Sequence, residues 1–123
     1  EENMANISSV FHNRLENMYE YPHLQSDTTD NYIEDVIRPN IPSSSLALYE
    51  NVITAYDTYT CEGLPAGPIC SPGLEAINAA LYPAETDYYY FLSSSDGVFY
   101  YASTVEKHEQ NIIDAALREE EQN

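Results

Sequence analysis

The chain has 123 residues and a large excess of negative charge: 21 Asp and Glu residues against 4 Lys and Arg give a formal charge of −17 at pH 7. So few cations cannot release the counterions that drive nucleic-acid binding, and the same charge disfavours anionic lipid surfaces. With 43% hydrophobic and 12% aromatic residues, the chain is expected to fold, and its length suits one domain. No apolar run approaches the roughly 20 residues of a membrane-spanning helix.

The first half of the chain is predicted to contain two helices and one strand. Met4, Ile7, Val10, Phe11 and Leu15 recur at helical spacing, which predicts an amphipathic helix over residues 3–17. The remaining predictions are a loop or short edge strand at 23–30, a short helix at 32–37 closed by Pro39, an irregular connection at 40–45, and a Tyr-rich, β-branched strand at 54–60.

Residues 63–73 form the most constrained loop of the sequence. It holds three of the four glycines, which permit positive φ, and three of the seven prolines, which restrict the backbone. Ser71 and Pro72 fit the N-cap and first position of a following helix. That helix is expected to bury a stripe of Leu74, Ile77 and Leu81 and to end before Pro83.

The last third predicts a β-hairpin and a helix. Two segments dense in Tyr and Phe, residues 87–92 and 98–101, flank the turn-forming segment 93–97. Ser103 and Glu106 fit a capping box for a helix whose tail, 118–123, is expected to fray. Its periodic positions are Val105, His108, Ile112, Ala115 and Ala116. Without a βαβ rhythm, the chain is predicted to be α+β, several helices around a small antiparallel sheet with a C-terminal β-hairpin and helix.

Metal and cysteine chemistry receive little support from the sequence. Cys61 and Cys70 flank a turn-rich loop, and the pattern fits a disulfide in an oxidising compartment as well as two free thiols. The three histidines, His12, His23 and His108, lack the paired spacing of a metal site. No metal and no cofactor are therefore expected.

Four stretches in this order resemble the endolytic murein transglycosylases of the YceG-like (MltG) family. They cover nearly all of residues 8–108, although each alone is a short match. They are Ser9-Val10-Phe11-His12-Asn13-Arg14-Leu15, Leu24-Gln25-Ser26-Asp27, Tyr56-Asp57-Thr58-Tyr59 leading into Gly63-Leu64-Pro65-Ala66-Gly67-Pro68-Ile69, and the hairpin ending in Thr104 with His108.

The resemblance implies a lytic transglycosylase that cleaves peptidoglycan between N-acetylmuramic acid and N-acetylglucosamine and leaves a 1,6-anhydro end. One Glu acts as acid and then base in such chemistry, and the C6 hydroxyl replaces water as nucleophile. Counting back along the family motif puts this Glu a few residues before Glu1. Glu1 and Glu2 themselves are expected at a frayed end. Residues 1–123 are therefore expected to be a single YceG-like domain fragment without the catalytic helix.

The resemblance also implies a place and partners. The longer protein is expected at the extracytoplasmic face of the bacterial cytoplasmic membrane, held only by an upstream anchor, because the chain begins without Met and is taken as a piece. Peptidoglycan glycan strands are the expected partner, with cell-wall synthases as further partners during strand termination. Nucleic acid is not expected.

The implied substrate site begins with Gln25, Ser26 and Asp27, whose amide, hydroxyl and carboxylate suit the groups of a sugar. An Asx-type turn would explain Ser26 and Asp27 equally well. On a strand, Tyr56 and Tyr59 would face opposite sides, so that one stacks on a pyranose. Gln25, Asp27, Tyr56, Asp57 and the Gly63–Ile69 loop are expected to converge on one concave surface. The other implied contacts are Asp57, Gly63, Leu64, Pro65, Pro68 and Ile69.

Three residues are assigned supporting places by the resemblance. Asn13 and Arg14 are expected to hold the cleft wall, with Arg14 pairing a carboxylate such as Asp27, although a solvated helix end would also account for them. His108 is expected to pack through hydrogen bonds. The sequence departs from the family pattern at Asp57, usually Asn, at Phe99, commonly His, and at Thr28, commonly Pro.

Two other functions remain open. One is a module that binds glycan or a synthase without cutting. The other is an aminodeoxychorismate lyase, a label sometimes given to this family, whose pyridoxal phosphate needs a lysine. The only lysine, Lys107, is expected on an exposed helix face without a phosphate-binding loop nearby, which disfavours this activity.

Overall fold

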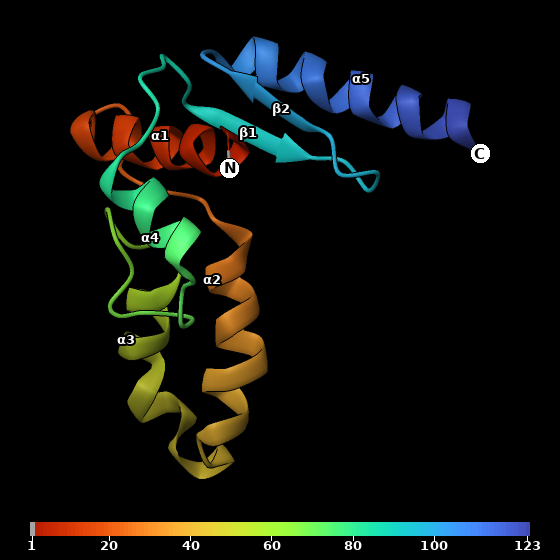
Figure 1. The fold of residues 1–123 in the computed structure, drawn as a ribbon. Coiled ribbons are helices and arrows are strands. Elements are labelled where there is room, and N and C mark those ends of the chain that lie inside the picture. The colour runs from red at the N-terminus through yellow and green to blue at the C-terminus, as the bar shows by residue number, and fades with distance from the viewer. Residues whose placement is uncertain (1) are drawn as a thin grey trace. The chain divides into compact units, whose positions relative to one another are not determined.

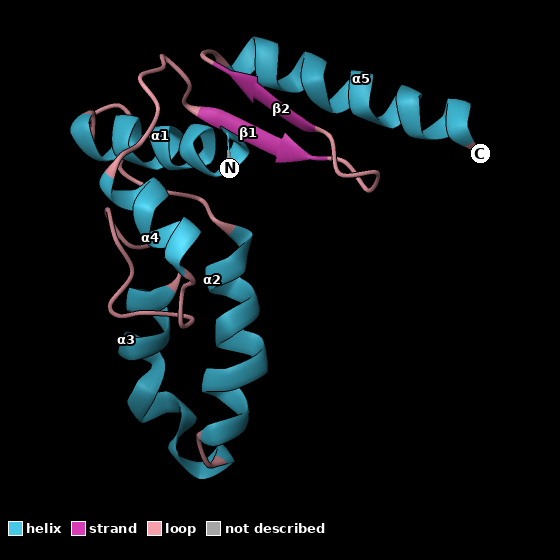
Figure 2. Ribbon diagram, in the orientation of Figure 1, coloured by secondary structure: helices cyan, strands magenta, loops and turns pink. Residues whose placement is uncertain are grey.

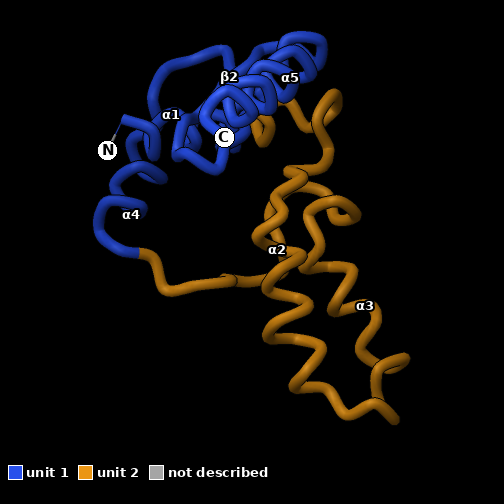
Figure 3. Tube along the Cα trace, turned by 90° about the vertical axis from the view of Figure 1, so that its right-hand side faces the viewer, with its two compact units in different colours: residues 1–13, 73–123 blue, residues 14–72 orange. Residues whose placement is uncertain are grey.

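The structure, a computed structural model, describes residues 2–123. The expectation for Glu1 lies outside these residues, and Glu2 is the first residue of helix α1 (Glu2–Glu16). The chain divides into two compact units, Glu1–Asn13 with Gly73–Asn123, and Arg14–Pro72 (Figure 3). Helices dominate the described residues and accompany a two-stranded antiparallel sheet, which confirms the predicted α+β class (Figure 2).

The first unit packs helices against a β-hairpin (Figure 1). After α1 it contains α4 (Leu74–Leu81), β1 (Tyr90–Ser93), β2 (Phe99–Ala102) and α5 (Val105–Gln122). The strands pair with Phe91 opposite Tyr101, and the ring of Phe91 meets that of Phe11 edge-on at 5.8 Å between centroids. The buried core of this unit contains Val10 from α1, Ala102 from β2 and Ala115 from α5.

Helix α1 also fixes the segment that leads into β1. Asn13 Nδ2 donates to the backbone carbonyls of Thr86, at 3.0 Å, and of Tyr88, at 2.9 Å. The hydroxyl of buried Ser9 lies 2.7 Å from that of Thr86. These polar groups satisfy a stretch of irregular backbone that has no strand partner, so the chain enters the hairpin along a defined path.

The helix at residues 3–17, the hairpin and the last helix are confirmed, whereas the predicted caps are wrong. Helix α4 begins at Leu74 with Gly73, not Ser71, at its N-cap. Helix α5 is capped by Thr104, whose hydroxyl accepts from the amide of Lys107 at 3.2 Å. Thr104 therefore takes the capping role that was predicted for its neighbour Ser103. For α5 the prediction named a hydroxyl residue one position too early, whereas the N-cap of α4 is a glycine without a side-chain hydrogen bond.

Two further predictions are wrong in this unit: the buried stripe of α4 and the frayed tail of α5. Leu74, Ile77 and Leu81 are exposed, and the contact that joins this short helix to α1 is polar: His12 Nε2 lies 2.8 Å from the carbonyl of Ala80. Helix α5 continues to Gln122 instead of ending in a frayed tail.

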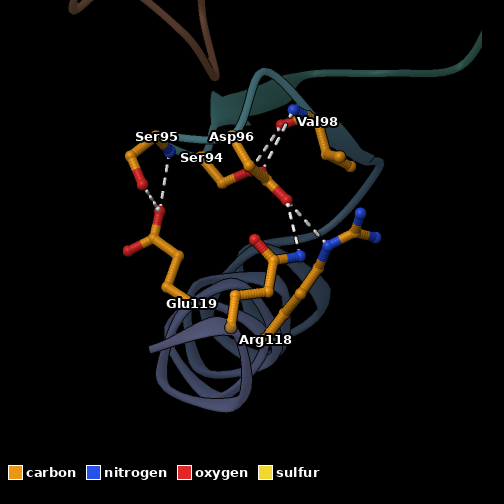
Figure 4. A network of polar contacts seen from close by, with 7 residues as sticks. Ser94, Ser95, Asp96, Val98, Arg118 and Glu119 are labelled. Carbon is orange, nitrogen blue, oxygen red and sulfur yellow. Dashed lines mark hydrogen bonds and ion pairs between the residues drawn. The ribbon is translucent and has the colours of Figure 1, made fainter.

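The hairpin turn is tied to the end of α5 (Figure 4). Asp96 accepts hydrogen bonds from the Ser94 hydroxyl and, at 2.9 Å, from Arg118 Nε. Glu119 accepts from the amide and hydroxyl of Ser95 at 2.7 and 2.8 Å. These contacts bind both sides of the turn and explain why the last turns of the helix remain helical.

Acid should loosen this connection. The hydrogen bond from Ser94, and then those from Arg118 and the Val98 amide, lower the pKa of Asp96 from 3.8 to about 2. A depressed folded-state pKa stabilises the fold above pH 3.8, and that contribution is lost as the pH falls toward 2. The thermal midpoint of the wild type should therefore exceed that of Asp96→Asn by a margin that shrinks over this range. A margin independent of pH would contradict the assignment.

The second unit is a helical hairpin followed by a long loop (Figure 1). Its first arm is α2 (Asp27–Tyr32), continued by a π-helical turn, η1 (Ile33–Ile37), and a 3₁₀ turn, η2 (Arg38–Asn40). A 3₁₀ turn, η3 (Ser43–Ser45), leads into the second arm, α3 (Leu46–Tyr56). Three aliphatic side chains are buried in this unit, those of Leu24, Ile33 and Ile53.

Two predictions are wrong in this unit. Of the predicted strand at 54–60, residues 54–56 are the end of helix α3 and residues 57–60 follow it as a turn. Ile53 and Tyr56 lie on a face that packs on the first arm, and this packing overrides the strand preference of Val, Thr and Tyr. The predicted loop or edge strand at 23–30 becomes helix α2 from Asp27 onward, although His23 forms an isolated bridge with Gly63. Within residues 2–123, none of the helices has the length and apolar character of a bilayer-crossing segment.

Candidate functional site

The turn before α2 brings the predicted polar residues into a constrained conformation. Gln25 has φ of +54°, a left-handed value found at no other described residue except two glycines. Its amide donates to the carbonyl of Thr58 at 3.1 Å. Arg14 Nη1 lies 3.4 Å from Gln25 Oε1 and donates to the carbonyl of His23 at 2.9 Å. The turn is therefore held from both sides.

Arg14 is a buried part of this arrangement. Only 5% of the residue is exposed, and its guanidinium lies over the Tyr21 ring, 5.4 Å from the centroid. Such burial excludes the solvated helix end that also fitted the sequence. The side chain acts as a brace for the backbone at His23 and for the Gln25 amide group.

Thr58 and Thr29 connect the turn to the end of the helical hairpin. Thr58 is 1% and Thr29 3% exposed, and their hydroxyls lie 2.8 Å apart. Thr58 Oγ1 accepts from the amide of Ser26 at 2.8 Å, and Thr29 Oγ1 donates to the Ser26 carbonyl at 2.8 Å. Neither threonine was predicted as a site residue. The only sequence signal was that Thr58 lies inside the Tyr56–Tyr59 motif.

Asp27 and Asp57 share Tyr59 as a partner. The Tyr59 hydroxyl donates to Asp27 Oδ1, while Asp57 Oδ1 accepts from the Tyr59 amide at 2.9 Å. The bond to Asp27 is the main cause that raises the pKa of Tyr59 to about 12, with burial and the charge of Asp27 adding to it. Tyr59 lies in a turn after α3, so the predicted two-faced strand of Tyr56 and Tyr59 does not exist.

The glycine-rich loop returns to the same segment. The Gly63 amide donates to the Pro22 carbonyl at 2.9 Å, and His23 Nδ1 to the Cys61 carbonyl at 2.9 Å, which requires a proton on Nδ1. Cys61 and Cys70 are both free thiols, and burial raises the pKa of Cys61.

Tyr56 meets the loop at Gly67. A β-carbon at this glycine would lie 2.6 Å from the Tyr56 hydroxyl, so the loop passes the ring closely. The Tyr56 ring also contacts that of Tyr32, with 5.7 Å between centroids. The Tyr56 side chain therefore packs against other residues of this unit.

The other predicted loop contacts are not joined to the turn. Leu64 is 68% exposed. No hydrogen bond among residues 2–123 links Pro65, Pro68 or Ile69 to Gln25 or Asp27. His108 belongs to the first unit, where it stacks on Tyr90 at 5.2 Å between ring centroids. Convergence of the whole set on a concave surface stays a prediction.

The groups that the Gln25–Asp27 turn can offer to a ligand are polar side chains. Across residues 2–123, no three His, Cys, Asp or Glu side chains are grouped as metal ligands. The turn offers an amide, a hydroxyl and a carboxylate to a ligand. Such groups bind hydroxyl and acetamido groups.

Gly63 should be much harder to replace than its exposed neighbour Leu64. Its φ of +68° is strained for any other residue, and a β-carbon would lie 3.2 Å from Met18 Cε. Gly63→Ala is expected to lower the free energy of unfolding by about 1–3 kcal/mol. Leu64→Ala, at the exposed neighbour, should change it by no more than about 0.5 kcal/mol. Equal urea midpoints for the two variants would contradict this account of the loop.

Comparisons with known proteins agree with the motifs. A sequence profile of the YceG-like family matches residues 1–114. A Bacillus subtilis protein named endolytic murein transglycosylase is 35% identical over 102 residues, covering 83% of this chain and 26% of the relative. A Streptococcus pneumoniae protein of the same name is 33% identical over 110 residues, covering 88% and 19%.

A solved structure agrees with the fold as well. The crystal structure of a YceG-like protein from Listeria monocytogenes matches with a TM-score of 0.66 and 36% identity, covering 86% of this chain and 33% of that one. The chain spans about a quarter or less of the curated relatives' length. The resemblance predicted from the four motifs is confirmed: this chain belongs to the YceG-like family.

Proposed function

We propose that this chain is part of a peptidoglycan lytic transglycosylase that cleaves between N-acetylmuramic acid and N-acetylglucosamine and leaves 1,6-anhydro ends. The observation that carries the proposal is the 35% identity, over 83% of the chain, to a relative named endolytic murein transglycosylase. The braced turn at Gln25, Ser26 and Asp27 supports it, because it presents sugar-binding groups from a rigid backbone.

The reaction needs one carboxyl group that gives a proton to the glycosidic oxygen. As a carboxylate, the same group then takes the proton from the C6 hydroxyl, whose oxygen attacks the anomeric carbon. We place this Glu upstream of residue 1, as the family motif indicates. The residues of this chain hold the sugar: the Gln25 amide and the Ser26 hydroxyl are donors and acceptors, and Asp27 accepts from sugar hydroxyls.

The setting of the reaction is part of the proposal. The longer protein would work at the outer face of the bacterial cytoplasmic membrane, held by an anchor upstream of this chain. There it would terminate glycan strands beside cell-wall synthases. The substrate named by the relatives, murein, supports this location.

The test is product analysis in heavy-oxygen water. The longer protein is incubated with purified glycan strands, and the new ends are examined by mass spectrometry. Unlabelled 1,6-anhydro ends are expected, because the C6 hydroxyl and not water attacks. Labelled reducing ends would show a hydrolase. Strands that are bound but uncut would show the non-catalytic binding module.

A further inference from the structure

We infer that Thr58 is a positioning residue of this site, which fixes the Gln25–Asp27 turn through the backbone of Ser26. The inference rests on the proposed function, because it assigns the turn to sugar binding. At 1% exposure, Thr58 cannot itself touch a glycan. Any effect on the reaction must pass through the groups that it holds.

The hydrogen bonds around Thr58 form a closed ring. The Ser26 amide donates to Thr58 Oγ1 at 2.8 Å, and the Thr29 hydroxyl donates to the Ser26 carbonyl at 2.8 Å. Since a hydroxyl has one proton, that of Thr58 is left to donate to Thr29 Oγ1, also at 2.8 Å. Thr29 Oγ1 also accepts from the Thr58 amide at 3.3 Å, and Thr58 Oγ1 lies 3.2 Å from the Ser26 carbonyl. Both backbone groups of Ser26 are thus satisfied within this ring.

The ring controls the residues on both sides of Ser26. Gln25 is held at φ of +54°, a region unfavourable for a residue with a β-carbon, and its own amide donates to the Thr58 carbonyl at 3.1 Å. Asp27 is held by the hydroxyl of Tyr59, the neighbour of Thr58. Thr58 and Tyr59 therefore hold the three consecutive residues 25–27 in place.

Loss of the Thr58 hydroxyl would remove its hydrogen bonds to the Ser26 amide and to the Thr29 hydroxyl. The Ser26 amide would keep no partner inside the protein, and the strained backbone at Gln25 could relax toward negative φ. A shift of about 1 Å in groups that orient a substrate is enough to slow a reaction by about 10²-fold. A purely structural threonine would lower stability without changing turnover in the folded protein.

Two substitutions separate these roles. Thr58→Val keeps the shape of the side chain and removes the hydroxyl, whereas Thr58→Ser keeps the hydroxyl and removes the methyl group. In the longer protein, at temperatures where both variants are folded, Thr58→Val should lower kcat/KM by about 10- to 100-fold. Thr58→Ser should remain within about threefold of wild type, although the lost methyl group also destabilises it. Equal activity losses in both variants, or full activity of Thr58→Val, would overturn the inference.

A second readout uses the 123-residue chain and does not depend on activity. Amide exchange at Ser26 should be slow in wild type and Thr58→Ser and fast in Thr58→Val. A strong intraresidue nuclear Overhauser effect between the amide proton and Hα of Gln25, which marks positive φ, should appear in the first two only. A Thr58→Val chain that keeps both properties would overturn the inference. If wild-type longer protein makes no anhydro product, the proposed function fails, and these measurements still decide whether Thr58 fixes the turn.

Discussion

Replacing Arg14 by Met should destabilise the second unit by about 2–4 kcal/mol. The substitution keeps an apolar stem but removes the donor to the His23 carbonyl, at 2.9 Å, and the cation over the Tyr21 ring. The bond to the His23 carbonyl is part-buried, and a carbonyl that loses its donor in such a place costs about 1–3 kcal/mol, to which the cation–π contact adds about 1 kcal/mol. Urea unfolding followed by far-ultraviolet circular dichroism would measure the change.

Arg38 provides the matched control in the same unit. Its bond to Glu34 spans 2.9 Å on the helix surface, where the two side chains are 38% and 55% exposed. Arg38→Met should cost no more than about 0.5 kcal/mol. If both variants lost the same free energy of unfolding, the contacts of Arg14 would not stabilise the turn, which would contradict this account.

The second large effect concerns the general acid. The 123-residue chain alone should release no 1,6-anhydro product, whereas a version extended upstream through the family's glutamate should release it. Replacing that glutamate by glutamine should slow the extended version by about 10²- to 10⁴-fold, the usual contribution of a positioned acid. Mass spectrometry of digested glycan strands would follow both.

The contradicting result is specific. Product from the 123-residue chain, abolished by Glu1→Gln or Glu2→Gln, would show that the acid lies within the chain. A glutamine variant of the extended version with wild-type activity would equally remove the upstream residue from its proposed role.

Local sequence signals identified the elements whose stability is local. Helix α1 follows from a strong 3.6-residue period, and the hairpin from two aromatic segments around a turn ending in Gly97, which has φ of +83°. Helix α3 could not be predicted in this way. Its Val, Thr and Tyr residues favour a strand, and the contact between Tyr56 and Tyr32, which stabilises the helix, is invisible before the fold is known.

The site shows the same limit. The motifs marked Gln25, Ser26 and Asp27 and a second group near Tyr59, but gave each tyrosine a place on a strand. The hydrogen bond between Tyr59 and Asp27 joins residues 32 positions apart, and the bond between Thr29 and Thr58 joins residues 29 apart. No local pattern encodes such pairs, so the role of Thr58 emerged only from the structure.

The most direct test of the central claim, that the Gln25–Asp27 turn binds glycan, is a nuclear magnetic resonance titration of the 123-residue chain. Soluble glycan fragments are added, and amide shifts are mapped on the sequence. Shifts should gather at residues 25–27 and at Tyr59, and Asp27→Asn should weaken binding. Asp35→Asn, an exposed carboxylate on the continuation of the same helix, should leave it unchanged. Shifts confined to other segments, or equal binding by the two variants, would contradict the account.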